Sequence, residues 1–326
     1  MKLLSIVVPC YNEQEVLPMF YDKITEVMGE LTAAHSELTY EIVFINDGSK
    51  DKTLEGFRKY ALMDDHIRYI SFSRNFGKEA GMYAGLNAAK GDYIVVMDAD
   101  LQHPPEFIPQ MYEYVSSGEY DCATTRRVSR KGESKVRSFF ARTFYKIMNK
   151  ISQTEIVDGA QDFRFMTRQM VDSILSMKEY NRFSKGIFSW VGYRVKYIEY
   201  ENVERAAGTT AWSFWGLFRY SVEGIVAFST APLAISVFLG ILSCIASVIV
   251  AIVSIIAGIA GGISQPWHPV IACLILLIGG FQLITTGILG QYLAKTYLEC
   301  KGRPVYITAE TEEDLKKKTG VETPGE

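Results

Sequence analysis

The sequence predicts an α/β protein with a doubly wound, mostly parallel sheet, followed by an interfacial amphipathic helix and two transmembrane helices. In the first part of the 326-residue chain, short apolar runs alternate with segments of helical spacing, a pattern typical of parallel sheets with covering helices. The carboxy-terminal third contains a stretch, 224–294, of 71 residues without Asp, Glu, Lys or Arg. Such a stretch predicts membrane-spanning segments.

These observations divide the chain into four parts. We expect an α/β domain over 1–210, a juxtamembrane interfacial segment over 211–230, two transmembrane helices over 231–297 and a cytoplasmic tail over 298–326. The net charge of -3 and the pI of about 5.9 give no reason to expect a nucleic-acid partner. The cysteines are scattered, so neither a disulfide framework nor a zinc site is predicted. The amino terminus shows no signal-peptide pattern, which favours a cytoplasmic first domain.

Two strand–helix units open the chain. Leu3–Val8 is an apolar run, and helical spacing of apolar residues follows it as far as Met28. The second strand covers Glu41–Ile45. A turn rich in Asn, Asp and Gly separates that strand from a helix over Lys52–Met63.

The third and fourth strands complete the parallel part of the predicted sheet. Ile67–Phe72 is the third strand, and it is followed by the helix Glu79–Ala89, whose small residues allow a close approach to a sheet. The fourth strand, Tyr93–Met97, is apolar throughout, as expected for a strand that is buried on both faces. An acidic turn follows, and Pro104 and Pro105 then start the next helix.

Asp98 and Asp100 stand two residues apart in this acidic turn, and Gln102 continues the spacing. If the chain remains extended, alternate side chains share one side, where their oxygen atoms could bind a divalent cation. Open α/β sheets bind their ligands at the carboxyl ends of the strands. The alternative interpretation is a polar turn without a ligand.

The segments after this turn return to the sheet and carry many basic residues. Tyr120–Thr125 is predicted as a fifth strand, and 126–142 contains seven Lys or Arg. This basic run is either a solvated face or an anion-binding loop beside the acidic turn. Asp158–Phe165 returns towards the sheet, a helix follows over 167–176, and Tyr193–Tyr200 alternates like a half-exposed strand.

The uncharged stretch and its flanks predict a membrane-embedded part. Residues 212–228 are aromatic with few charges, which indicates a helix in the bilayer interface or, alternatively, an ordinary core helix. Leu233–Ile259 and Val270–Lys295 are each long enough to cross a hydrocarbon core of ~30 Å. The Lys and Arg residues of the tail predict that it is cytoplasmic. We therefore expect a multi-pass protein of the inner (cytoplasmic) membrane with both termini in the cytoplasm.

Six motifs occur in the order seen in a known family. They are Ile-Val-Val-Pro-Cys-Tyr-Asn-Glu (6–13), Asn-Asp-Gly-Ser-Lys-Asp-Lys-Thr (46–53), Ser-Arg-Asn-Phe-Gly-Lys-Glu-Ala (73–80), Met-Asp-Ala-Asp-Leu-Gln-His-Pro-Pro-Glu (97–106), Asp-Phe-Arg (162–164) and Glu-Arg-Ala-Ala-Gly-Thr-Thr (204–210). The sequence thereby resembles the membrane-bound glycosyltransferases of the dolichol-phosphate mannose synthase type, within the inverting glycosyltransferase family two of GT-A fold. It is most similar to the bacterial polyprenyl-phosphate (bactoprenol) glucosyltransferases with two carboxy-terminal membrane helices.

The resemblance implies a role for each matching residue. The residues that would hold a nucleotide sugar are Pro9, Tyr11, Glu13, Ile45, Asp47, Lys78 and Asp98. The residues that would bind Mg²⁺ or Mn²⁺ against the diphosphate are Asp98, Asp100 and Gln102. The residues that would clamp the phosphate of a polyprenyl acceptor are Arg126, Arg137 and Arg205.

Asp162 and Asp100 are the residues to which the resemblance assigns catalysis. Asp162 matches the family's acidic residue near the acceptor. It would orient the acceptor or its Arg partners, or it would act as a general base. The alternative is a purely structural ion pair with Arg164 or Arg168.

The implied reaction is an inverting, metal-dependent transfer of a hexose from a nucleotide sugar, UDP-glucose, to undecaprenyl phosphate. Other donors, such as UDP-N-acetylglucosamine, and a non-catalytic nucleotide-binding membrane component stay open as alternatives. The resemblance also implies a homo-oligomer, namely a tetramer. Two positions depart from the family pattern, since Ala211 stands where a Lys is usual and Gln161 where a Gly is common.

Overall fold

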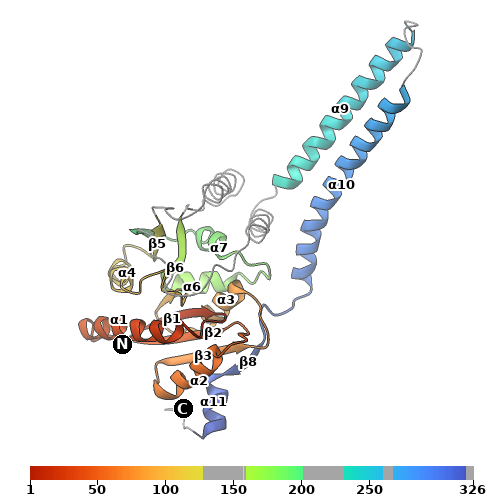
Figure 1. The fold of residues 1–326 in the computed structure, drawn as a ribbon. Helices are drawn as coiled ribbons and strands as arrows, with labels where there is room; N and C mark the ends of the chain where they lie inside the picture. Colours follow the sequence, from red (N-terminus) through yellow and green to blue (C-terminus); the bar gives the residue numbers. More distant parts are fainter. Residues whose placement is uncertain (128–156, 158, 201–230, 260–266, 321–326) are drawn as a thin grey trace.

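The described part of the chain forms an α/β domain from which two long helices extend (Figure 1). The computed structural model describes residues 1–127, 157, 159–200, 231–259 and 267–320. The strands are β1 (Lys2–Cys10), β2 (Leu38–Asn46), β3 (Ile67–Phe72), β4 (Tyr93–Val96), β5 (Cys122–Arg127), β6 (Ala160–Thr167), β7 (Val195–Tyr200) and β8 (Thr308–Thr311). The helices are α1 (Leu17–Ala34), α2 (Thr53–Met63), α3 (Lys78–Ala88), α4 (Phe107–Ser116), α6 (Arg168–Ser176), α7 (Ser184–Trp190), α9 (Ala231–Ile259), α10 (Trp267–Cys300) and α11 (Glu312–Thr319).

The described strands form one mixed sheet in the order β7-β5-β6-β4-β1-β2-β3-β8. Its centre, β3-β2-β1-β4, is parallel, and Val7 of β1 lies between Val43 of β2 and Val96 of β4. This confirms the predicted parallel sheet for the first four strands. The later strands depart from it, because β6 runs antiparallel to both β4 and β5 and β8 runs antiparallel to β3.

The core explains why the central strands are almost continuously apolar. Leu4, Ile6 and Val8 of β1 belong to a buried cluster that includes residues of α1, α2 and α4. The intervening Val7 belongs to a second cluster with residues of α3, α6 and α7. Alternate side chains of a strand project to opposite faces. Helices therefore bury both faces of the sheet, as parallel strands require.

Helix α3 lies unusually close to the sheet, as its small residues predicted. A Cβ atom placed on Gly85 would lie 2.1 Å from Cγ1 of Val7, and one on Gly81 would lie 3.2 Å from Cβ of Pro9. Only glycine leaves room for such an approach. The close packing brings the first residue of α3, Lys78, to the edge where the parallel strands end.

The segment predicted as a cytoplasmic tail contributes β8 and α11 to the α/β domain (Figure 1). The sequence analysis did not predict this strand. Glu310 of β8 accepts hydrogen bonds from Nε and Nη2 of Arg58, at 2.8 and 2.7 Å, and from the hydroxyl of Tyr69 at 2.6 Å. These contacts fasten the end of the chain to β3 and α2.

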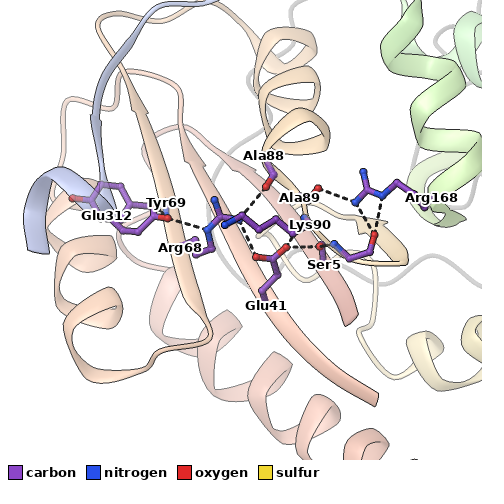
Figure 2. A network of polar contacts seen from close by, with 10 residues as sticks. Ser5, Glu41, Arg68, Tyr69, Ala88, Ala89, Lys90, Arg168 and Glu312 are labelled. Carbon is purple, nitrogen blue, oxygen red and sulfur yellow. Dashed lines mark hydrogen bonds and ion pairs between the residues drawn. The ribbon is translucent and has the colours of Figure 1, made fainter. Parts of the chain in front are cut away.

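A polar network continues from this tail across the sheet (Figure 2). Arg68 of β3 contacts Glu312 and Glu41, each at 2.9 Å. Glu41 in turn accepts a hydrogen bond from the hydroxyl of Ser5 at 2.5 Å, and Arg168 donates to the carbonyl of Gly91 at the far end of the network. The network joins α11, β3, β2, β1 and α6, and it lies towards the amino ends of the parallel strands.

Helices α9 and α10 pack against each other and extend away from the sheet (Figure 1). Large apolar side chains on both helices are exposed, for example Phe238 at 65% and Leu283 at 76%. Within the residues that the structure describes, one helical segment, Leu277–Cys300, has the length and composition needed to cross a membrane, and a shorter apolar segment covers Pro232–Ser243. The predicted interfacial helix, 212–228, lies outside the described residues.

Candidate active site

The antiparallel direction of β6 brings two distant acidic residues together. The pairing of β4 with β6 sets Val96 opposite Arg164. Two residues further along each backbone are Asp98, which follows β4, and Asp162, which lies near the start of β6. Because β6 runs antiparallel to β4, β6 begins beside the end of β4. Asp162 therefore lies beside the acidic turn at the carboxyl edge of the sheet.

Lys78 bridges these two carboxylates. Its Nζ atom lies 2.7 Å from Oδ1 and 2.8 Å from Oδ2 of Asp98, and 2.9 Å from Oδ2 of Asp162. The side chains of Asp98 and Asp162 are 27% and 19% exposed, against 39% for Lys78. The three residues come from the turn after β4, from β6 and from α3, so only the folded sheet assembles them.

Opposing effects set the charge state of Asp162. Burial alone would raise the pKa of its carboxyl, but the positive charges of Lys78 and Lys185 outweigh burial and hold the pKa well below its usual value. The pKa of Lys78 is correspondingly raised, because Asp162 and Asp98 more than offset its desolvation. A carboxylate with a lowered pKa is a poor proton acceptor. The orienting role of Asp162 requires no protonation, and it stays a prediction.

The purely structural interpretation predicts an ion pair between Asp162 and Arg164 or Arg168, and neither arginine forms this ion pair. Arg168 donates hydrogen bonds to the carbonyls of Gly91 and Ala89. The guanidinium of Arg164 lies 4.6 Å from the ring centroid of Phe188, and its charge only adds to the field at Asp162. The contacting cation is Lys78 of α3.

Asp100 and Gln102 form the turn after β4. The backbone N–H of Gln102 donates to Oδ1 of Asp100 at 3.1 Å, and the intervening Leu101 has a positive φ of 56°. One oxygen of Asp100 therefore accepts a hydrogen bond within the turn. The extended spacing assumed for the cation site is wrong, since the chain bends at Leu101.

The donor set can still be tested against a divalent cation. Within the described ranges, no group of three or more His, Cys, Asp or Glu side chains could hold a metal. Mg²⁺ commonly takes one or two carboxylates and completes its shell with water and substrate phosphate oxygens. Asp98 and Asp100, with the amide oxygen of Gln102, are hard oxygen donors of this kind. They fit a cation that binds together with a diphosphate.

The end of β1 and the loop after it carry three residues predicted to hold a nucleotide sugar, Pro9, Tyr11 and Glu13. Pro9 lies beneath α3 at the end of β1, and Tyr11 is 43% exposed. The backbone N–H of Glu13 donates to the hydroxyl of Thr53 at 2.9 Å. This bond ties the loop after β1 to the start of α2, so these residues border the same edge as Asp98.

Two further predicted nucleotide contacts have partners within the protein. Ile45 is 0% exposed and belongs to a buried cluster beneath α3. Its place near a base stays a prediction. The carboxylate oxygens of Asp47 accept hydrogen bonds from the backbone N–H groups of Phe76 at 2.6 Å and Gly77 at 2.9 Å. Asp47 therefore holds the loop that precedes Lys78.

The predicted acceptor clamp is described only at Arg126. This residue lies near the end of β5, and its Nη1 is 3.8 Å from Oε1 of Glu199. Arg137 and Arg205 lie outside the described residues, as does most of the basic run 126–142. The clamp thus stays a prediction.

The structure adds residues that sequence reasoning did not single out. Glu79 accepts a hydrogen bond from the backbone N–H of Ser184 at 3.0 Å and another from its hydroxyl. Lys185 follows on α7 and contributes to the positive field at Asp162. Glu79 stands within one of the recognised motifs, but Ser184 and Lys185 stand in none. No local signal could have placed α7 beside α3.

His103 contacts Gln161, one of the two positions that depart from the family pattern. It is 6% exposed, and its Nε2 lies 3.3 Å from Oε1 of Gln161. Its ring also lies 5.7 Å from that of Phe163. Gln161, which stands where related sequences often carry Gly, thus links the turn after β4 to the start of β6.

Comparisons with known proteins show the family of this chain. The family described as Glycosyl transferase family 2 matches residues 5–175. A prophage bactoprenol glucosyl transferase homolog of Escherichia coli is 41% identical over 93% of this chain and 97% of its own length. The bactoprenol glucosyl transferase of Shigella phage SfII is 40% identical over 93% of this chain and 96% of its own length. The glucosyl-3-phosphoglycerate synthase of Mycobacterium tuberculosis, solved with Mn²⁺ and UDP-glucose, aligns with a TM-score of 0.44 at 18% identity, covering 69% of this chain and 78% of that one.

Proposed function

Because the chain belongs to glycosyl transferase family 2 and is a glycosyltransferase, we propose that it transfers a hexose from a nucleotide sugar to a polyprenyl phosphate. The proposed donor is UDP-glucose and the proposed acceptor is undecaprenyl phosphate. The names of the relatives, which span nearly the whole of this chain, support a glucosyl group and a bactoprenol carrier. UDP-N-acetylglucosamine is the alternative donor.

The observation that carries this proposal is the bridge from Asp98 through Lys78 to Asp162. Asp98 belongs to the edge where the predicted nucleotide contacts Pro9, Tyr11 and Glu13 lie. Asp162 belongs to β6, whose neighbour β5 carries the predicted acceptor contact Arg126 near its end. In this proposal Lys78 lies between the donor and the acceptor. Such a position suits a transferase, because its two substrates must meet.

On the donor side, the chain would stabilise a departing nucleoside diphosphate. Mg²⁺ or Mn²⁺ on Asp98, Asp100 and Gln102 would supply positive charge against the diphosphate oxygens. Lys78 adds a cation from the first turn of α3, where the helix dipole also favours anions. These groups act on charge that develops as the bond to the sugar breaks.

On the acceptor side, no proton needs to be removed. A phosphate monoester has a second pKa of about 6 and is mostly dianionic at neutral pH. One phosphate oxygen forms a bond to the anomeric carbon while the bond to the diphosphate oxygen breaks, and its electron pair leaves with the diphosphate. This in-line step inverts the configuration at the anomeric carbon, so an α-linked donor gives a β-linked product. Asp162 would orient the acceptor through Lys78 and its basic neighbours.

The long helices support a membrane-bound acceptor. We place α9 and α10 across the inner membrane, with the α/β domain and both termini in the cytoplasm. The exposed apolar side chains of these helices favour a lipid environment. Lys295, Lys301 and Arg303 supply positive charge at the end of α10 that joins the α/β domain. A homo-oligomer stays a prediction.

The test is transfer of radiolabelled sugar from a panel of UDP- and GDP-sugars to undecaprenyl phosphate in detergent, with and without EDTA. We expect one donor to give an organic-extractable product that EDTA abolishes. Asp98→Asn and Asp162→Asn should each lower transfer about a hundredfold or more. Asp172→Asn is the matched control, since this carboxylate is 62% exposed on α6.

Two results would contradict the proposal. Full activity in both site variants would favour a non-catalytic nucleotide-binding membrane component. An α-linked product from an α-linked donor would contradict the single displacement.

A further inference from the structure

The ammonium of Lys78 contacts Asp98, the carboxylate that would also bind the divalent cation. Both oxygens of Asp98 lie within 2.8 Å of Nζ. A carboxylate that offers both oxygens to one cation has less charge to offer a second. Two cations on the same carboxylate also repel each other at short range. Lys78 and a metal ion therefore compete for Asp98.

The backbone around Lys78 is fastened on both sides, so the competing charge is held in place. Before it, Phe76 and Gly77 donate their N–H groups to Asp47. After it, Glu79 accepts hydrogen bonds from Ser184 of α7. The side chain of Lys78 is 39% exposed, which leaves its ammonium free to change partners while the backbone stays fixed.

We propose that Lys78 is an internal counter-cation that makes tight metal binding depend on the nucleotide. This inference rests on the proposed function and deepens it. Without nucleotide, Lys78 neutralises Asp98 and weakens binding of the metal alone. When a nucleoside diphosphate is present, its oxygens give the ammonium a second anionic partner, and Asp98 becomes available to the metal. Asp162 keeps its contact with Lys78 in both states.

The experiment measures Mn²⁺ affinity by the electron paramagnetic resonance signal of free Mn²⁺, with and without UDP. For the natural chain we expect UDP to tighten Mn²⁺ binding markedly. For Lys78→Met we expect Mn²⁺ binding without UDP to tighten about tenfold, since a contacting positive charge is removed. UDP should then tighten Mn²⁺ binding less than it does in the natural chain, because the coupling between the two ligands is reduced.

Matched variants separate charge from other effects. Lys78→Arg keeps the positive charge and should keep the weak binding of Mn²⁺ alone. Lys59→Met removes a lysine from the exposed surface of α2 and should change nothing. Lys78→Gln gives a second uncharged variant, and far-UV circular dichroism checks that each variant is folded.

The outcomes distinguish this inference from the proposed function. Unchanged or weaker Mn²⁺ binding in folded Lys78→Met or Lys78→Gln overturns the inference. Equal Mn²⁺ affinity with and without UDP in the natural chain overturns it even if neither variant folds. If Asp98→Asn retains full Mn²⁺ binding, the metal site of the proposed function is wrong instead.

Discussion

Glu79 follows Lys78 in the sequence, yet its carboxylate has different partners. It accepts hydrogen bonds from the backbone and side chain of Ser184 of α7. Burial raises the pKa of Glu79 to about 7; hydrogen bonds from Ser184 oppose this rise, and the negative charge of Asp162 adds to it. Glu79 therefore changes its charge near neutral pH, next to the proposed site.

The raised pKa predicts a pH-dependent stability. A carboxyl whose pKa is higher in the folded state than in the unfolded state favours folding at low pH, and this contribution is lost as pH rises from about 4.5 to about 7. Glu79→Gln lacks the titrating group. We expect its free energy of unfolding, relative to the natural chain, to rise by about 1–3 kcal/mol across that window.

Thermal unfolding in detergent, followed by circular dichroism between pH 4.5 and pH 8, measures this difference. Glu55→Gln on the exposed face of α2 is the control. A difference between Glu79→Gln and the natural chain that does not change with pH would show that Glu79 keeps an ordinary pKa.

At the scale of elements, the packing of α3 places the lysine. Gly81 and Gly85 let this helix approach β1 and β2, and the helix begins at Lys78. The loop before α3 packs equally closely against the loop after β2, since a Cβ on Gly48 would lie 2.4 Å from the backbone carbonyl carbon of Arg74. The position of Lys78 thus depends on glycines within α3 and in the loop after β2.

Gly85→Ala tests this dependence. The added methyl group would lie 2.1 Å from Cγ1 of Val7, a stiff β-branched side chain in the centre of the sheet. We expect a loss of about 1–3 kcal/mol of unfolding free energy. Transfer activity should also fall, because α3 must shift and carries Lys78 with it.

Gly29→Ala is the matched control, because a Cβ at this position of α1 meets nothing within 4 Å. It should raise the unfolding free energy by about 0.5–1 kcal/mol, the usual gain for replacing a helical glycine. Chemical unfolding of both variants measures these opposite effects. Equal stability of the two variants would mean that α3 tolerates displacement without cost.

At the scale of the molecule, the chain leaves the α/β domain, forms α9 and α10, and returns to complete the sheet (Figure 1). The end of α10 is also tied to the domain, since Glu299 accepts hydrogen bonds from the backbone N–H groups of Tyr180 and Asn181. Tyr180 and Asn181 precede Ser184 in the chain, and Ser184 contacts Glu79 beside Lys78. The end of α10 is therefore fastened to the domain by Glu299 and by β8, which follows it in the chain.

Glu310→Gln tests the tail attachment. Hydrogen bonds from Arg58 lower the pKa of Glu310 to about 2, with burial opposing and Tyr69 adding to the effect. The ionised carboxylate of Glu310 stabilises the fold above about pH 4.5, and this contribution is lost as pH falls towards 2. At neutral pH we expect the variant to lose about 1–3 kcal/mol of unfolding free energy. Hydrogen exchange of β8 should accelerate.

Glu313→Gln is the control, because this carboxylate is exposed on α11. Its hydrogen exchange should match that of the natural chain. Unchanged exchange of β8 in Glu310→Gln would show that backbone pairing with β3 is enough to hold the tail.

The local pattern of the sequence determined the central strands and the polar residues that end them. Ile67–Phe72 was predicted with the bounds that the structure has, and Tyr93–Met97 differs from β4 by one residue. Periodicity and turn residues act over a few positions, and they reflect burial on both faces of the sheet. The family motifs added predicted roles for Asp98 and Asp162.

Only the tertiary structure decided the order of the later strands and the partners of the acidic residues. The direction of β6 beside β4 sets Asp162 against Lys78, and this pairing joins residues 84 positions apart. Strand β8 is a short edge strand, Thr-Ala-Glu-Thr, with no buried residue, so its sequence lacks the apolar signal of a core strand. Such pairings depend on contacts between distant segments, and the free energy of these contacts is not expressed in any local pattern of residues.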